Sequence, residues 1–141
     1  MAGFIFCVIA GAAMSVQGVM NTRLGQGIGN LQANALVQCT AAALSLAALL
    51  FARDGSFSRL SQVSWGCWLG GALGLLITLA VMLGIRALSP TVAVSVILIA
   101  QLLVAAGIDA FGLMGAERVH FGWTQLLGVA LMVGGVLVFK R

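Results

Sequence analysis

The stretch LSQVSWGCWLGGALGLLITLAVMLGI, residues 60–85, contains no charged side chain and is rich in leucine and glycine. A helix needs about 20 apolar residues to cross the hydrocarbon core of a bilayer, and this stretch is long enough. Four further uncharged runs, at residues 1–22, 24–52, 87–108 and 119–139, reach the same length. The sequence therefore predicts an all-α integral membrane protein with five transmembrane helices.

The composition of the whole chain agrees with this class. Of the 141 residues, 62% are hydrophobic and 7% are charged, and the mean hydropathy is +1.16. A soluble domain is typically about 25% charged, so a soluble enzyme, a disordered protein and a secreted disulfide scaffold are excluded. The net charge of +4 comes from basic residues scattered along the chain, without the basic patch that binding to nucleic acid requires.

The boundaries of the spans follow from turn residues. The segment LGQGIGN, residues 24–30, has glycine at alternate positions and is expected to be a turn. Ser89 and Pro90 are expected to cap and begin the fourth helix, and a loop is expected over residues 109–122. The predicted spans, which form one membrane domain over residues 1–141, are 3–20, 31–51, 64–85, 90–108 and 123–139.

Three glycines in the third span, Gly66, Gly70 and Gly74, are each four residues apart. This spacing places them on one face of a helix, where small residues allow a second helix to approach closely. They are expected to be helix-packing residues, although glycine is also common in transmembrane helices for no such reason.

The basic residues are divided almost evenly between the two sides of the membrane. Orientation normally follows an excess of Lys and Arg on the cytoplasmic side, and here no such excess exists. Either other signals fix the topology, or the chain inserts in both orientations and pairs with an inverted copy of itself. One side holds Arg53, Arg59 and Arg118, and the other holds Arg23, Arg86, Lys140 and Arg141.

Amide side chains recur at helical spacing inside the predicted spans. Gln17 and Asn21 share one face of the first span, and Asn30, Asn34 and Gln38 form a stripe at the start of the second. Polar residues within a membrane are functional candidates, because each needs a partner or a wet cavity. Interhelical hydrogen bonding is the alternative explanation. The residues expected to bind a solute are Gln17, Asn21, Asn34, Gln38, Gln101 and Asp109.

Residues that would carry protons, catalyse a reaction or bind a metal are missing from the sequence positions where such functions would need them. The centre of each span lacks Asp, Glu and Lys, which disfavours strict exchange of protons for cations and favours neutral or zwitterionic solutes. The alternative is that Asp109 contributes charge near one mouth of the path. The sequence has a single histidine and no paired carboxylates, so neither an enzyme, a metal site nor a bound cofactor is expected. Cys7, Cys39 and Cys67 are expected to be buried packing residues.

Several motifs resemble the five-helix YdcZ-type branch of the drug/metabolite transporter superfamily. These are Gln17-x-x-x-Asn21-x-x-Leu24-Gly25, the pairing of Gln101 with Asp109-x-Phe111-Gly112-Leu113, and Gln125-Leu126-Leu127-Gly128 at the start of the fifth span. The resemblance covers essentially the whole chain. Two positions depart from the family pattern, which often has Gly where Ala100 stands and Pro early in the second span.

The resemblance implies a secondary transporter of a small metabolite or drug in the bacterial inner membrane. Larger relatives of the EamA type fuse two such halves in opposite orientation. A single half is therefore expected to form an antiparallel homodimer, or to pair with a homologous half, among the membrane lipids. The alternative is a membrane-embedded accessory or scaffold subunit without its own solute path.

Overall fold

The computed structural model describes residues 1–51, 55, 57–115 and 122–139, and within these ranges the chain is helical with no strand. The long helices are α1 (Ala2–Ile28), α2 (Asn30–Leu49), α3 (Gly70–Ala87), α4 (Pro90–Phe111) and α5 (Trp123–Phe139). Short 3-10 helices are η1 (Phe57–Gln62), η2 (Trp65–Leu69) and η3 (Leu113–Gly115). The prediction of an all-helical protein is confirmed.

Four segments are long and apolar enough to cross a membrane: α1, α2, α4, and η2 together with α3. Helix α5 has 17 residues, at the lower limit of the length that spans a bilayer. Large apolar side chains on these helices are exposed on the chain, among them Phe4, Leu44, Leu76 and Leu131. Because water would oppose such exposure, lipid or a partner helix must cover these surfaces.

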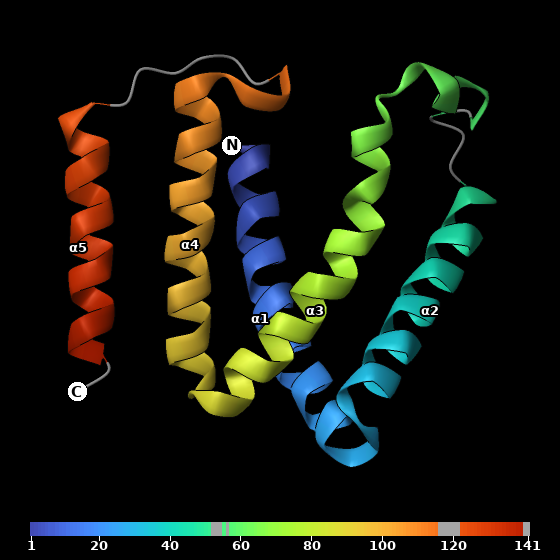
Figure 1. Ribbon diagram of the computed structural model, residues 1–141, viewed down its shortest axis with the longest axis horizontal. Helices are drawn as coiled ribbons and strands as arrows, with labels where there is room; N and C mark the ends of the chain where they lie inside the picture. The colour runs from blue at the N-terminus through green and yellow to red at the C-terminus, as the bar shows by residue number, and fades with distance from the viewer. Residues whose placement is uncertain (52–54, 56, 116–121, 140–141) are drawn as a thin grey trace. The chain divides into compact units, whose positions relative to one another are not determined.

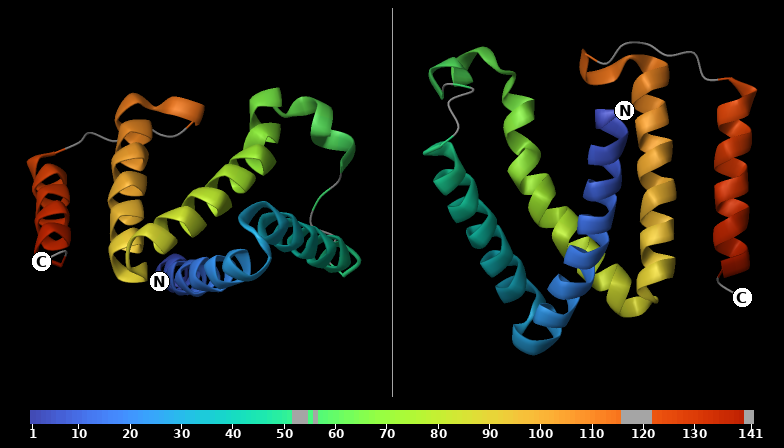
Figure 2. Two further views of the ribbon diagram at one scale, coloured as in Figure 1. Left: turned by 60° about the horizontal axis from the view of Figure 1, so that its bottom comes forward. Right: turned by 180° about the vertical axis from the view of Figure 1, so that it is seen from behind.

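The chain divides into two compact units, Met1–Ala87 and Leu88–Arg141. In the first unit α1 contacts both α2 and α3, and α2 contacts α3 (Figure 1). In the second unit α4 and α5 run side by side in opposite directions (Figure 2). The expectation of a single domain stays a prediction.

The structure corrects the turn expected over residues 24–30. Helix α1 continues through Gly25 and Gly27 to Ile28, and only Gly29 lies outside a helix, with φ of 97°. An L-residue is strained at positive φ, so Gly29 suits this joint. Gly29 also stands at the N-terminus of α2, where no side chain caps the helix.

Two other boundaries differ from expectation. The third span begins as the 3-10 helix η2 and becomes α-helical only at Gly70. Helix α4 extends to Phe111, so Asp109 lies within its last turn and not in a loop. The start of α4 is as expected, since the Ser89 hydroxyl accepts a hydrogen bond from Val92 N at 3.3 Å and Pro90 follows directly.

The burial of the cysteines also differs from expectation. Cys7, Cys39 and Cys67 are free and exposed on the surface of the chain, and are not buried packing residues.

Among the charged residues used to compare the two membrane sides, Arg53, Arg118, Lys140 and Arg141 lie outside the described residues.

Candidate functional site

In the first unit the buried side chains gather where α1, α2 and α3 meet. Asn21 and Thr22 of α1 are 8% and 7% exposed, and Asn34 of α2 is 2% exposed. Met82 and Ile85 of α3 are buried with them. Amides and a hydroxyl thus lie among apolar side chains, where a polar group without a partner costs free energy.

Two glycines of α1 bring α3 close to these polar groups. Gly18 and Gly25 are about two turns apart on one face, and both are buried. A Cβ atom at Gly18 would lie 2.9 Å from Ile85 Cδ1, and one at Gly25 would lie 2.7 Å from Met82 Cε. Both distances are shorter than a normal van der Waals separation, so a side chain at either position would require the end of Ile85 or Met82 to move.

The glycines expected to pack helices occupy other surroundings. Gly66 lies in η2, and a Cβ atom there would come no closer than 4.0 Å to Ser64 Oγ. A Cβ atom at Gly70 would meet nothing within 4 Å, and one at Gly74 would lie 3.6 Å from Gln38 Nε2. Of these three glycines, only Gly74 is near another long helix within the described residues, and packing through Gly66 and Gly70 stays a prediction.

One turn of α3 takes part in two of the side-chain hydrogen bonds of the first unit. Asn34 Nδ2 donates a hydrogen bond to Leu75 O at 3.1 Å, and Thr78 Oγ1 donates one to Gly74 O at 2.9 Å. Asn34 Oδ1 is buried and has no hydrogen-bond partner in the part of the chain that the structure describes. Since an unpartnered buried acceptor costs about 1–3 kcal/mol, this atom is the most unusual polar group of the unit.

The other predicted residues of the first unit border the same turn. Gln17 and Asn21 line a narrow crevice of about 50 Å³ together with Ile77 and Thr78 of α3. Gln38 is half-buried, with its amide beside Gly74. Residues 74–78 of α3 thus lie between the amides of α1 and those of α2. Sequence reasoning missed Thr78, because a hydroxyl that bonds its own helix is common in membrane helices.

Asn30 lies in different surroundings from Asn34 and Gln38, the other two amides expected to form a stripe on the second span. It is the first residue of α2, and a Cβ atom at Gly25 would lie 2.7 Å from its Oδ1 atom. Its side chain therefore belongs to the joint between α1 and α2.

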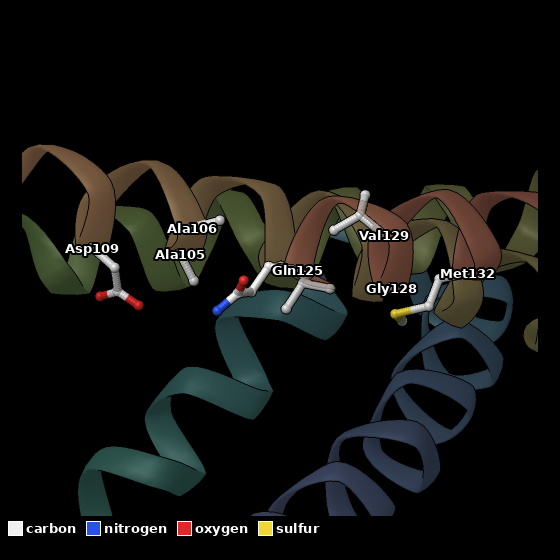
Figure 3. A pocket seen from close by; sticks show the side chains of 8 residues that line it. Ala105, Ala106, Asp109, Gln125, Gly128, Val129 and Met132 are labelled. Atoms are coloured by element: carbon white, nitrogen blue, oxygen red, sulfur yellow. The ribbon is translucent and has the colours of Figure 1, made fainter. Parts of the chain in front are cut away.

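In the second unit the predicted residues are less enclosed. Gln101 is exposed, and its side chain makes no hydrogen bond to the described part of the chain. Asp109 is also exposed and lines a pocket of about 530 Å³ between α4 and α5 (Figure 3). Gln101 does not line that pocket.

Metal ligation finds no support in the part of the chain that the structure describes. No group of three His, Cys, Asp or Glu side chains there lies close enough to hold an ion.

Apolar helices with exposed apolar surfaces, and amides enclosed between them, define a multi-helix integral membrane protein. A family model described as "Putative inner membrane exporter, YdcZ" matches residues 2–138, and the chain belongs to this family. The resemblance noted in the sequence is thereby confirmed, and membership in an exporter family supports a membrane transporter. Comparison with curated proteins and with solved structures gave no match.

Proposed function

We propose that the protein is a secondary transporter that moves a small metabolite or drug across the bacterial inner membrane by alternating access. The observation that carries the proposal is Asn34 Oδ1, a buried acceptor without a hydrogen-bond partner among the described residues. Gln17 and Asn21 line a crevice with Thr78 of α3, the helix to which Asn34 is bonded. A helix-packing amide would use both of its polar atoms. Because this acceptor is buried, a solute or water would reach it when α1, α2 and α3 move apart during alternating access.

The transporter is proposed to work as an antiparallel dimer around a central amide-lined site. The nearly even division of basic residues supports insertion in both orientations. Exposed apolar side chains on α1, α2 and α3 supply surface for a second copy or a homologous half. The proposed solute contacts are Gln17, Asn21, Asn34 and Gln38 within the first unit and, as separate contacts, Gln101 and Asp109 within the second.

Transport is tested with proteoliposomes and a mixture of amino acids, sugars and monoamines, measured by mass spectrometry. Wild-type protein should accumulate at least one compound above protein-free liposomes. Asn34→Leu should abolish this accumulation while the protein still folds, because leucine has a similar size and no polar atoms. Gln32→Leu is the matched control, since Gln32 is an exposed amide on the same helix.

Two results would overturn the proposal. Protein that moves no compound of the mixture would favour the accessory subunit, in which amides only hold helices together. Equal transport by Asn34→Leu would remove the amide site from the mechanism.

The antiparallel arrangement has its own test. A C-terminal epitope tag should be accessible from both sides of the membrane within one population of wild-type protein. Labelling from one side alone would overturn the homodimer and leave pairing with a homologous half.

A further inference from the structure

The pocket of the second unit exists because the facing helices carry small side chains. Ala105 and Ala106 of α4 and Gly128 of α5 all line it, and these small residues leave the space between the two helices unfilled (Figure 3). The resulting volume of about 530 Å³ lies in the range of pockets that hold drug-sized ligands. The residues lining it are Leu102, Ala105, Ala106, Asp109, Gln125, Gly128, Val129 and Met132.

The two ends of the pocket differ in polarity. Asp109 and Gln125 lie toward one end with Ala105 between them, and Met132 lies at the other end (Figure 3). Asp109 is in the last turn of α4 and Gln125 in the first turn of α5. Leu102 is about 10 Å further along α4, at 1.5 Å per residue. The polar end therefore lies near the ends of the spans, and the apolar end lies deeper.

The polar end offers one negative charge and one hydrogen-bond donor. Gln125 Oε1 already accepts hydrogen bonds from Gly122 N at 2.9 Å and Thr124 Oγ1 at 3.1 Å. Its Nε2 group has no acceptor among the described residues. The Asp109 carboxylate likewise makes no hydrogen bond or ion pair with the described chain. The carboxylate attracts a cation, and because Asp109 is exposed the pairing is partly screened by water.

We propose that this pocket binds an organic monocation, a primary ammonium carried on an apolar body. The ammonium pairs with the Asp109 carboxylate, and the apolar body lies along Ala105, Gly128 and Met132. An anion would be repelled by Asp109, and a neutral compound would forgo the charge pair. We commit to a diffusible compound and not to a lipid headgroup, because the pocket has the volume of a drug-sized molecule.

The inference deepens the proposed function and rests on it in one respect: it names the class of solute that the transporter carries. Binding to purified protein does not depend on transport. Binding without transport overturns the proposed function alone, whereas transport without a preference for cations overturns the present inference alone.

The test uses three compounds with one apolar body and different heads: 4-phenylbutylammonium, 4-phenylbutanol and 4-phenylbutanoate. Full-length protein in phosphatidylglycerol nanodiscs is titrated calorimetrically with each compound, and empty nanodiscs supply the blank. The ammonium should bind about two- to fivefold more tightly than the alcohol, which is the contribution of an ion pair at an exposed carboxylate. Equal affinities for the three heads would overturn the proposal.

Two variants locate the site. Asp109→Asn should remove the preference for the ammonium, and retention of the preference would overturn the proposal. Gly128→Leu should fill the pocket and weaken binding at least about tenfold, since a Cβ atom at Gly128 meets nothing within 4 Å and the fold accepts it. Gly134→Leu is the matched control, because Gly134 is equally open on the same helix but does not line the pocket.

A last arm distinguishes the diffusible ligand from lipid. Nanodiscs in which phosphatidylethanolamine replaces half of the phosphatidylglycerol add a primary ammonium headgroup without the probe. Unchanged affinity for 4-phenylbutylammonium supports a diffusible ligand. Loss of that affinity would overturn the proposal, because the lipid would then be the occupant.

Discussion

The two units of the chain differ in how far they bury their polar side chains. In the first unit Asn21, Thr22 and Asn34 are buried against α3, where Gly18 and Gly25 bring the helices together. In the second unit Asp109, Gln125 and Gln101 are exposed, and only Ala93 is fully buried among its described residues. Glycine in the first unit therefore closes space, while glycine and alanine in the second leave it open.

The largest expected effect follows from tight packing in the first unit. Gly25→Leu should lower the free energy of unfolding by about 3 kcal/mol, because the new side chain enters the space of buried Met82. Gly27→Leu is the control, as a Cβ atom there meets nothing within 4 Å and leucine favours the helix by up to about 1 kcal/mol.

Thermal unfolding in detergent measures both variants. Equal stability of Gly25→Leu and Gly27→Leu would show that α1 does not pack closely on α3, and the contrast between the units would fail.

An intermediate effect compares one amide from each unit. Asn34→Ala should lower stability by about 1–2 kcal/mol through the lost bond to Leu75 O and the space left behind. Gln101→Ala should change it by less than about 0.5 kcal/mol, since the side chain is exposed. Denaturant titration gives both values. A cost at Gln101 equal to that at Asn34 would indicate a partner for Gln101 in the assembled protein.

The smallest effect is local to the first turn of α5. Gln125 Oε1 accepts from Gly122 N, so that it satisfies one of the free amides at the helix start. Gln125→Ala should cost about 0.5–1 kcal/mol there, seen as faster hydrogen exchange in the first turn of α5. Gln125→Glu keeps an acceptor and should exchange like wild type. Faster exchange in both variants would mean that the cap does not stabilise α5.

The sequence was sufficient to predict the helices, because uncharged runs of membrane-spanning length have few alternatives in lipid. The turn over residues 24–30 was wrong for a related reason. In a membrane helix glycine destabilises the helix little, because its backbone hydrogen bonds stay within the helix. Gly25 lies inside α1 and against Met82 of α3. Only the positive φ of Gly29 ends the helix, and no pattern in the sequence distinguishes it from Gly27.

The candidate site was predictable in part. Gln17, Asn21, Asn34 and Gln38 stand out as amides in apolar spans, and the structure brings all of them to residues 74–78 of α3. The contribution of Leu75 could not be predicted, because it is a backbone carbonyl that any residue would supply. Gly18 and Gly25 were missed because their spacing of two turns is not the four-residue repeat that marks close helix pairs.

The joint at Gly29 has a consequence for how such a protein can move. With a single residue between α1 and α2, the connection has no slack that could let one helix slide past the other. Helix α1, 27 residues and about 40 Å long, can change its position relative to α2 only by rotation about Gly29. Any opening of the first unit would then change the contacts of α1 and α2 with α3, including those at Gly18 and Gly25.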